Sequence, residues 1–417
     1  MTDKKFSTKN LHLDRLSKPE HGALHKPIHT SVAFGYEDAR DLAAVFQGTK
    51  KGYAYSRQLN PTISALQNKI TKMEEGIATL AFSTGMAAIA ATMLSLLRAG
   101  DNIIASSFLF ANTRSFLSTL EGLGITVTLV DPTESKNIEA AITPDTTIIF
   151  VETIANPVTQ VADLAGIGAV CLKHNILYCV DNTLTTPCLF LPKTVNASLV
   201  INSLTKSIGG HGNALGGTVT DTGLYDWSLF KNIKSSGNHS EMSQWGITQI
   251  RKKGLRDMGA TLSPESGHRL SIGSETLSLR LERACNNAMS FALFCNKHPL
   301  VTQTFYPGLK NHPQHIRATE LFNSFGTLVS INLNDKIDCF EVLNNMKTVI
   351  ASTNLGDNRT LGIPVAHTIF YELDSKQRES MGIKDSMLRF AIGIEDEQDL
   401  LDDLNQALEQ ARGMAND

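Results

Sequence analysis

One lysine stands between small hydroxyl residues and a glycine cluster in the segment NSLTKSIGGHG, residues 202–212. An apolar run, LVINS, ends just before it, so Lys206 is expected directly beyond a strand. A lysine amine in such a place can form a Schiff base with a carbonyl compound. The hydroxyls of Ser203 and Thr205 could accompany a phosphate, and the glycines would let the backbone approach a flat ring. A surface lysine beside a flexible turn is the alternative, and this segment alone does not decide between them.

A carboxylate at the end of a second apolar run favours the covalent interpretation. Asp181 ends the segment ILYCVD, 25 residues before Lys206. A carboxylate there can pair with a protonated pyridine nitrogen, which keeps a cofactor ring poor in electrons and able to accept the charge of a carbanion. Alone, Asp181 could equally be a turn or cap residue. The two residues together are far more specific than either one.

The segment FSTGMAAIAA supplies a third element. Thr84 and Gly85 stand where a short apolar run gives way to a helical pattern. The first N–H groups of a helix have no partner within the helix, which makes a helix start a natural cradle for phosphate. An ordinary Thr-Gly turn with a helix cap is the more common explanation of such a pair. It loses weight beside the lysine and the aspartate.

The elements that must position these residues alternate between strands and helices. Short apolar segments rich in branched residues are separated by helical patterns, and they read NIIASS, TVTLV, TIIFVET, ILYCVDN and LVINS. This order predicts a parallel sheet covered by helices on both faces, with its site beyond the carboxyl ends of the strands. Polar residues follow the strands at once, namely Glu152, Asn156, Asp181, Asn182, Ser203 and Lys206. We therefore expect one convergent pocket.

The chain of 417 residues is longer than one hydrophobic core normally supports. Residues 1–60 lack sustained periodicity and are predicted to form an arm that contacts a neighbouring subunit. Residues 61–261 carry the alternating pattern of a large domain. Residues 262–417 contain a long helical segment, the strand-like TLVSINL and a last helix, which predict a smaller α/β C-terminal domain.

Composition excludes several classes of function. A formal net charge of −3 offers no basic field for nucleic acid, so a small-molecule ligand is expected. The six cysteines lie in apolar contexts without a C-x-x-C pair, which predicts buried free thiols and no metal site. The chain has neither a signal-peptide pattern nor an apolar run of the roughly 20 residues that cross a bilayer. We expect a cytoplasmic protein that does not enter a membrane.

Five stretches resemble the transsulfuration enzymes that depend on pyridoxal 5′-phosphate (PLP), also called the Cys/Met metabolism family. They are YSRQLNPT at 55–62, STGMAAI at 83–89, ETIANP at 152–157, VDNTLTTP at 180–187 and NSLTKSIGGHGNALGG at 202–217. The resemblance implies a cystathionine γ-synthase-like protein with the aspartate aminotransferase type of PLP-dependent transferase fold (fold type I). That fold has a mostly parallel central sheet and a smaller C-terminal domain. The resemblance also implies a homotetramer built from active dimers.

The resemblance implies a role for each matching residue. Lys206 binds the cofactor covalently and acts as the general base, while Asp181 is the partner of the pyridine nitrogen. Asn156 lies near the phenolic oxygen of the cofactor and the substrate carboxylate, and Arg389 in LRFAIG clamps that carboxylate. The positions that bind phosphate within the subunit are Thr84, Gly85, Met86, Ser203 and Thr205. Tyr55 and Arg57 reach into the neighbouring subunit's site and hold its phosphate, so a monomer is expected to be inactive.

This sequence also departs from the family. Most relatives place a tyrosine over the cofactor ring, whereas the residue here is Phe110, which can stack but has no hydroxyl. Any acid or base step of that hydroxyl falls to Tyr55 or Lys206. Ala111 and Asn112 provide no thiol where methionine γ-lyases carry a cysteine. Asn354, predicted to contact the substrate, stands where many lyases have serine, and Thr353 stands where several have an acidic residue. These departures resemble the O-acylhomoserine sulfhydrylases.

We therefore expect an enzyme that makes or breaks carbon–sulfur bonds, with γ-replacement on an O-acylhomoserine to give homocysteine or cystathionine as the leading interpretation. The alternative is a lyase that acts on methionine, cystathionine or homocysteine and releases a thiol, a 2-oxoacid and ammonia. A remote alternative is a non-catalytic PLP-binding protein. Replacement or elimination, β or γ attack and the acyl group stay open. Residues 223–256 do not match the family's pattern. His268 is more simply explained as a solvated or core histidine than as a pocket residue. The segment AHTIFYE at 366–372 also differs from the family's pattern, so the residues that contact the distal end of the substrate stay unassigned.

Overall fold

A computed structural model of the protein describes residues 4–13, 19–233 and 241–414. A seven-stranded sheet in the order β1-β7-β6-β5-β4-β2-β3 forms its centre. The strands are β1 (Ala78–Phe82), β2 (Asn102–Ser106), β3 (Thr126–Val130), β4 (Thr146–Glu152), β5 (Leu177–Asp181), β6 (Leu199–Ser203) and β7 (Gly217–Asp221). All pairs are parallel except those of β7, which is antiparallel to both β1 and β6. The mostly parallel sheet predicted from the sequence is confirmed.

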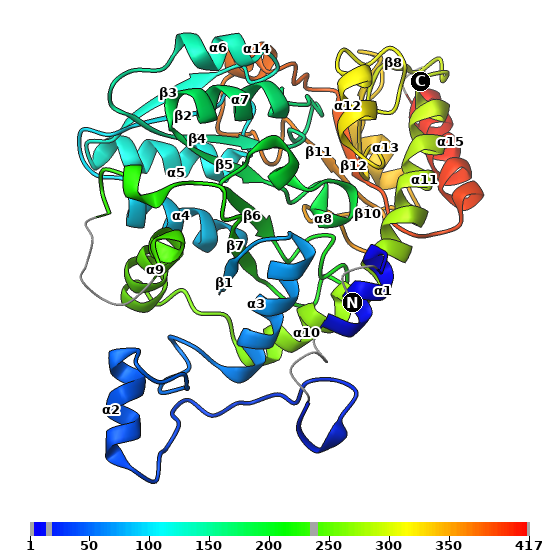
Figure 1. The fold of residues 1–417 in the computed structure, drawn as a ribbon. Helices are drawn as coiled ribbons and strands as arrows, with labels where there is room; N and C mark the ends of the chain where they lie inside the picture. Colours follow the sequence, from blue (N-terminus) through cyan, green and yellow to red (C-terminus); the bar gives the residue numbers. More distant parts are fainter. Residues whose placement is uncertain (1–3, 14–18, 234–240, 415–417) are drawn as a thin grey trace.

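Helices cover both faces of this sheet (Figure 1). They are α3 (Pro61–Met73), α4 (Gly85–Leu96), α5 (Ala111–Gly122), α6 (Ser135–Ala140), α7 (Leu164–His174), α8 (Thr186–Leu189) and α9 (Trp245–Gln249), with short 3₁₀ turns η3 (Pro192–Val195), η4 (Trp227–Leu229) and η5 (Met242–Gln244). Strand β4 shows why both faces are apolar: Ile148 and Phe150 pack with α4 and α5, whereas Ile149 and Val151 pack with α7. Side chains of successive residues in a strand point to opposite faces, so a strand buried on both sides needs a continuous apolar run.

The segment that matched no pattern in the sequence contains a π-helix, η6 (Ile250–Asp257), which packs against α4. Gly254 allows this approach, since a Cβ there would lie 2.7 Å from Ser95 Oγ and 2.8 Å from the carbonyl oxygen of Ala91. The part of the segment at residues 234–240 lies outside the described residues.

The C-terminal part builds a second sheet in the order β10-β11-β12-β9-β8, with all pairs antiparallel except β10 and β11. Its strands are β8 (Val301–Phe305), β9 (Leu328–Leu333), β10 (Ile350–Ala351), β11 (Leu361–Pro364) and β12 (Met387–Ala391). The accompanying helices are α10 (Pro264–Glu275), α11 (Leu277–Cys295), α12 (His315–Leu321), α13 (Cys339–Asn345), α14 (Ser375–Ser380) and α15 (Glu397–Met414). A separate core joins α11, α13 and α15 to this sheet. The smaller α/β unit expected from the sequence is present.

The N-terminal segment is less uniform than the extended arm predicted for residues 1–60. Helix α1 (Phe6–His12) returns to the body of its own chain, where the side-chain amide of Asn10 donates to the carbonyl of Ser274 in α10. After it come the short η2 (Glu20–Gly22) and α2 (Ala39–Gln47), which has no buried residue and stands away from the rest of the chain (Figure 1). The predicted contact of this arm with another subunit stays a prediction, as do the domain limits at 61 and 262.

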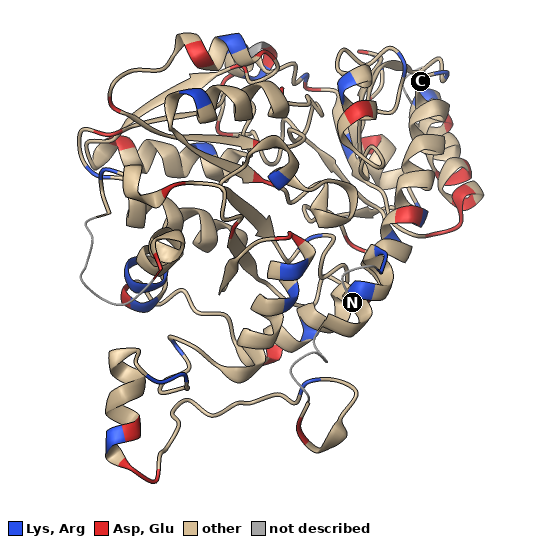
Figure 2. Ribbon diagram, in the orientation of Figure 1, with Lys and Arg blue, Asp and Glu red and all other residues tan. Residues whose placement is uncertain are grey.

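The remaining expectations from composition can be compared with the fold. All six cysteines are free, and five of them are buried, with Cys188 partly exposed. Lysine, arginine and acidic residues are interspersed over the elements in Figure 2. Across residues 4–13, 19–233 and 241–414 no helix is both long and apolar enough to cross a membrane, and no cluster of His, Cys, Asp and Glu could hold a metal ion.

Candidate active site

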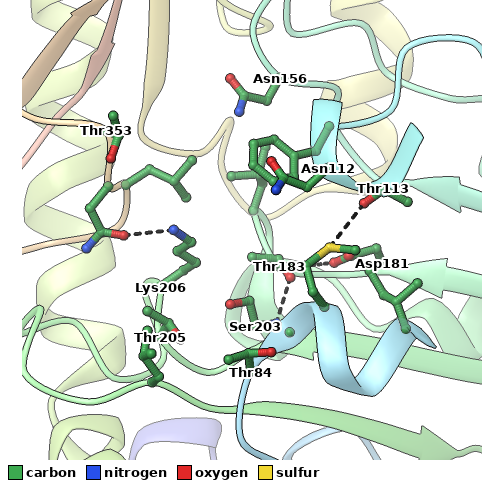
Figure 3. Close-up of a pocket in the computed structure, with 18 of the residues that line it drawn as sticks. Thr84, Asn112, Thr113, Asn156, Asp181, Thr183, Ser203, Thr205, Lys206 and Thr353 are labelled. Carbon is green, nitrogen blue, oxygen red and sulfur yellow. Dashed lines mark hydrogen bonds between the residues drawn. The ribbon is translucent and has the colours of Figure 1, made fainter. Parts of the chain in front are cut away.

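A cavity of about 960 Å³ lies where the end of the large sheet meets the C-terminal part of the chain. It gathers most of the residues predicted from the sequence, several of which are labelled in Figure 3. Its lining includes Thr84, Gly85, Met86, Phe110, Asn156, Asp181, Ser203, Thr205, Lys206, Thr353, Asn354 and Arg389. Residues from seven separate segments of the sequence therefore converge on one space, and five of the six polar residues that the sequence places after strands are among them.

Strand ends position the acidic and hydroxyl groups of the cavity. Glu152, Asp181 and Ser203 are the last residues of β4, β5 and β6. Glu152 and Asp181 are paired in register across β4 and β5, so their side chains share the same edge of the sheet. The carboxyl ends of parallel strands form the usual site of such folds.

The start of α4 lies in the cavity wall, where the sequence predicts a phosphate cradle. Thr84 caps the helix, because its hydroxyl accepts a hydrogen bond of 2.9 Å from the backbone N–H of Ala87. The first N–H groups of the helix, including those of Gly85 and Met86, have no partner within the helix. A Cβ at Gly85 would lie 2.8 Å from Cβ of Ser203, so only glycine allows this close approach to the end of β6. N–H groups and hydroxyls facing one space at a helix start fit a phosphate group.

Lys206 projects into the cavity beside this cradle. Its Nζ donates a hydrogen bond of 2.8 Å to the side-chain oxygen of Asn354, which comes from the C-terminal part of the chain (Figure 3). Burial, and to a smaller extent the positive charge of Arg389, lowers the pKa of Lys206 to about 8. At neutral pH roughly a tenth of such amines are uncharged, compared with well under a thousandth for an exposed lysine. This environment suits a nucleophile and a base.

Asp181 remains largely ionised although it is deeply placed. Burial raises the pKa of Asp181 to about 6, an effect opposed by hydrogen bonds from Thr183. One of these bonds joins the backbone N–H of Thr183 to Asp181 Oδ1 at 3.0 Å. The hydroxyl of Thr183 in turn accepts from the N–H of Ser203 at 2.8 Å, which ties the ends of β5 and β6 together. A carboxylate held in this way can pair with a protonated ring nitrogen.

The sequence marks Glu152 only as a polar residue beside a strand end and predicts no role for it. Its Oε1 accepts a hydrogen bond of 2.9 Å from the backbone N–H of Phe110, so it holds the start of α5 against the cavity. Burial, together with the negative charge of Asp181, raises the pKa of Glu152 to about 8. Two neighbouring buried carboxyls therefore differ, with Asp181 ionised and Glu152 mostly protonated at neutral pH.

Arg389 lies at the opposite wall and is 1% exposed. One terminal nitrogen donates to the backbone oxygens of Thr353 and Asn354 at 3.2 and 3.1 Å, and the other lies 3.5 Å from Asn156 Oδ1. Burial lowers the pKa of Arg389 only to about 10, so the group stays charged. Its Nε is buried and makes no hydrogen bond within the described chain. A buried cation with a free donor fits a carboxylate ligand.

Three residues that the sequence predicts at the site do not line the cavity of their own chain, namely Tyr55, Arg57 and Asn182. Asn182 is buried, and its side-chain amide donates to Glu74 and to the carbonyl of Phe190. Tyr55 is 41% exposed, and the Arg57 guanidinium lies 5.5 Å from its ring centroid. The contact of Tyr55 and Arg57 with a second subunit stays a prediction. His268 lies on α10 in a separate small pocket with His25, as expected of a histidine outside the site. Ile369, from the unassigned segment 366–372, does line the cavity, and no signal in the sequence pointed to it.

The chain is similar to known proteins along nearly its whole length. The pattern of the Cys/Met metabolism PLP-dependent enzymes matches residues 7–409. An L-methionine gamma-lyase of Fusobacterium nucleatum subsp. polymorphum is 34% identical over 417 residues, which cover 98% of this chain and 100% of that protein. The sulfhydrylase FUB7 of Fusarium oxysporum f. sp. lycopersici is 33% identical over 424 residues and 98% of both chains. The crystal structure of a Campylobacter jejuni protein, assigned as an O-acetylhomoserine (thiol)-lyase and carrying N′-pyridoxyl-lysine-5′-monophosphate, superposes with a TM-score of 0.92 at 28% identity, covering 97% of this chain and 100% of that one.

Proposed function

The chain belongs to the Cys/Met metabolism PLP-dependent enzyme family, and we propose that within this family it catalyses γ-replacement on an O-acylhomoserine, with sulfide or a thiol as the incoming group. Membership makes it a PLP-dependent transsulfuration enzyme that acts on carbon–sulfur bonds. The product of the proposed reaction is homocysteine when sulfide enters and cystathionine when cysteine enters.

The residues of the cavity fit the cofactor. In the proposal, Lys206 would hold the aldehyde carbon and Asp181 would pair with the ring nitrogen. The start of α4, with Ser203 and Thr205, would hold the phosphate. Phe110 would contact the ring, and Asn156 would contact the phenolic oxygen. When bound, the cofactor withdraws electrons from the α-carbon of the amino acid substrate and so makes the proton there acidic.

The residues around it then handle the substrate. Arg389 binds the substrate carboxylate with its charged and partly unpaired guanidinium, and Asn156 supports the same end. Lys206 Nζ, whose pKa is lowered to about 8 by burial, removes a proton at the α-carbon and returns it later. Asn354 accepts a hydrogen bond from Lys206 Nζ at 2.8 Å and therefore fixes the position of the free amine.

The observation that carries γ-replacement is the phenyl ring of Phe110 in the cavity wall, where a hydroxyl would be needed to protonate a leaving group. A carboxylic acid has a pKa of about 4 and a thiol a pKa of about 8.5, so a carboxylate leaves as a stable anion whereas a thiolate gains much more from a proton donor. The chain therefore suits an acyl ester of homoserine better than methionine or cystathionine.

A second candidate is a carbon–sulfur lyase, favoured by the 34% identity to an L-methionine gamma-lyase along nearly the whole chain. The two functions are separated by supplying the purified enzyme with O-acetyl- or O-succinylhomoserine plus sulfide and, separately, with methionine and cystathionine. Homocysteine and 2-oxoacid are then measured. We expect homocysteine from the esters as the main product. Release of 2-oxoacid as the main product with every substrate would make the enzyme a lyase.

A variant sharpens this test. Phe110→Tyr restores a hydroxyl and should raise 2-oxoacid release from methionine, relative to homocysteine formation from the ester, by about tenfold or more, because general acids typically contribute at least that much. Phe340→Tyr, which adds the same hydroxyl at an exposed position on α13, is the matched control. An unchanged ratio in Phe110→Tyr would refute the leaving-group argument.

We also propose that the active unit is a dimer within a homotetramer, in which Tyr55 and Arg57 of each chain complete the site of the partner. Mixing Arg57→Ala with Lys206→Ala after partial unfolding tests this. Neither variant is expected to be active alone, but a mixed dimer holds one site with both native residues. Activity should therefore return on mixing, and no return at any ratio would place Arg57 in its own chain's site.

A further inference from the structure

A buried glutamate, Glu74, is not used by the proposed mechanism and does not line the cavity. Glu74 follows α3 and is 0% exposed. Its Oε1 accepts two hydrogen bonds, from Nδ2 of Asn182 at 3.1 Å and from Nδ2 of Asn202 at 2.6 Å. No lysine, arginine or histidine of the described chain forms an ion pair with it. A carboxylate buried in this way would be an uncompensated charge.

The two asparagines adjoin residues that the proposed function places on the cofactor. Asn182 follows Asp181 at the end of β5, and Asn202 precedes Ser203 in β6. Asn182 is itself fixed, because its backbone N–H donates to the carbonyl of Ile201 at 2.8 Å and its side-chain oxygen accepts from the hydroxyl of Thr185. Glu74 therefore joins the ends of the two strands that carry Asp181 and Ser203.

Two polar atoms among Glu74, Asn182 and Asn202 have no hydrogen-bond partner in the described structure. Glu74 Oε2 and Asn202 Oδ1 are both buried, and neither takes part in a hydrogen bond in the described structure. An ionised carboxylate oxygen and an amide oxygen are both hydrogen-bond acceptors. The carboxyl group of Glu74 and the amide of Asn202, which carry these atoms, are already joined by the short hydrogen bond from Asn202 Nδ2 to Glu74 Oε1. Turning the amide of Asn202 would not help, since it would bring two oxygens together at 2.6 Å. A proton on Oε2, donated to Oδ1, satisfies both atoms at once.

We propose that Glu74 is a neutral carboxylic acid joined to Asn202 by two hydrogen bonds, and that it acts as a positioning residue for Asp181 and Ser203. The inference rests on the proposed roles of these two residues in cofactor binding. Burial independently raises the pKa of Glu74 to about 7, against the smaller opposing effects of Asn182 and Asn202, and no charged group contributes. A pKa of about 7 makes Glu74 mostly protonated at pH 6, in agreement with the geometry.

Infrared difference spectroscopy of the whole protein tests the protonation directly and needs no turnover. At pH 6 the spectrum of wild type minus Glu74→Gln should be dominated by the carbonyl stretching band of a protonated carboxyl group. Glu75→Gln removes the neighbouring exposed glutamate and is the matched control, expected to be dominated by carboxylate bands. Dominant carboxylate bands in the Glu74→Gln difference would overturn the proposal.

Cofactor affinity tests the positioning. A glutamine side chain is neutral, has the length of glutamate, and carries an N–H donor in place of the carboxyl O–H. The affinity of apo-Glu74→Gln for PLP should therefore lie within about twofold of that of wild type. Asp is one methylene shorter, and apo-Glu74→Asp should bind PLP at least tenfold more weakly. The opposite order, with Asp retained and Gln weakened, would show that the charge matters and would refute the inference. If instead Asp181→Asn leaves affinity unchanged, the proposed cofactor contact is wrong while the infrared result stands by itself.

Discussion

Replacing Asn354 by Asp tests the environment of Lys206, on which the proposed chemistry depends. In the native chain Lys206 Nζ lies 2.8 Å from the neutral side-chain oxygen of Asn354, and burial followed by the charge of Arg389 lowers the pKa of Lys206 to about 8. The substitution keeps the shape of the side chain and adds one negative charge at this contact.

The size of the effect follows from the distance. Two unit charges 2.8 Å apart attract by at most about 6 kcal/mol at an effective dielectric constant of about 20. Measured shifts for an opposite charge at such distances are smaller, about 1 to 3 pKa units. The pKa of Lys206 should therefore rise from about 8 to between about 9 and 11. At pH 7 the fraction of free amine, and with it the rate of attack on an aldehyde, should fall by about tenfold to a thousandfold.

The assay is the capture of PLP by the apo-protein at a series of pH values, with the lysine-bound cofactor reduced by borohydride and quantified by mass spectrometry. Wild type should reach half of its maximal rate near pH 8, and Asn354→Asp at least one unit higher. Asn354→Ser keeps a neutral hydrogen-bonding group and is the control, expected within about half a unit of wild type. A midpoint of Asn354→Asp equal to that of wild type would show that the 354 side chain does not meet Nζ. A tag on another lysine would refute the assignment of Lys206.

Three further predictions concern the site and its support. Gly85→Ala should weaken PLP binding by about tenfold to a hundredfold in a fluorescence titration, because the added Cβ would lie 2.8 Å from Cβ of Ser203 and overpacking costs about 1–3 kcal/mol. Gly122→Ala is the control and should bind PLP normally, since a Cβ added there meets nothing within 4 Å. Asp181→Asn should lower turnover at least a hundredfold, because the carboxylate is proposed to pair with the ring nitrogen. The stability of the apo-protein should rise or stay equal, since burial raises the pKa of Asp181 to about 6 and its ionised form is costly in the empty site. A loss of turnover below tenfold would argue against the ring-nitrogen contact. Trp227→Phe removes the indole N–H that donates to buried Asp221 at 2.9 Å and should reduce the unfolding free energy by about 1–3 kcal/mol. Since burial raises the pKa of Asp221 to about 6, that loss should be larger at pH 8, where the group is ionised, than at pH 5, and an equal loss at both would count against the charge.

Local patterns were sufficient for most of the large sheet. The five apolar segments correspond to β2, β3, β4, β5 and β6, and the short apolar run and helical pattern on either side of Thr84 correspond to β1 and α4. The antiparallel β7 was not predicted, because its Thr-rich sequence GTVTD has no continuous apolar run although every residue in it is buried. Neighbouring strands β1 and β6 supply the partners that make this polar strand possible.

That Lys206 and Asp181 line one cavity could be predicted from the sequence, because Asp181 ends one apolar strand, Lys206 comes soon after another, and strand ends in a parallel sheet meet at one edge. Contacts between segments far apart in the sequence could not be predicted in this way. The hydrogen bond of Lys206 to Asn354 spans 148 residues, and that of Glu74 to Asn202 spans 128. Nothing in the local sequence distinguishes the buried Glu74 from the exposed Glu75 beside it. Ionisation depends on which groups exclude water from a side chain, so the different protonation states of Glu74, Glu152 and Asp181 were decided only by the tertiary structure.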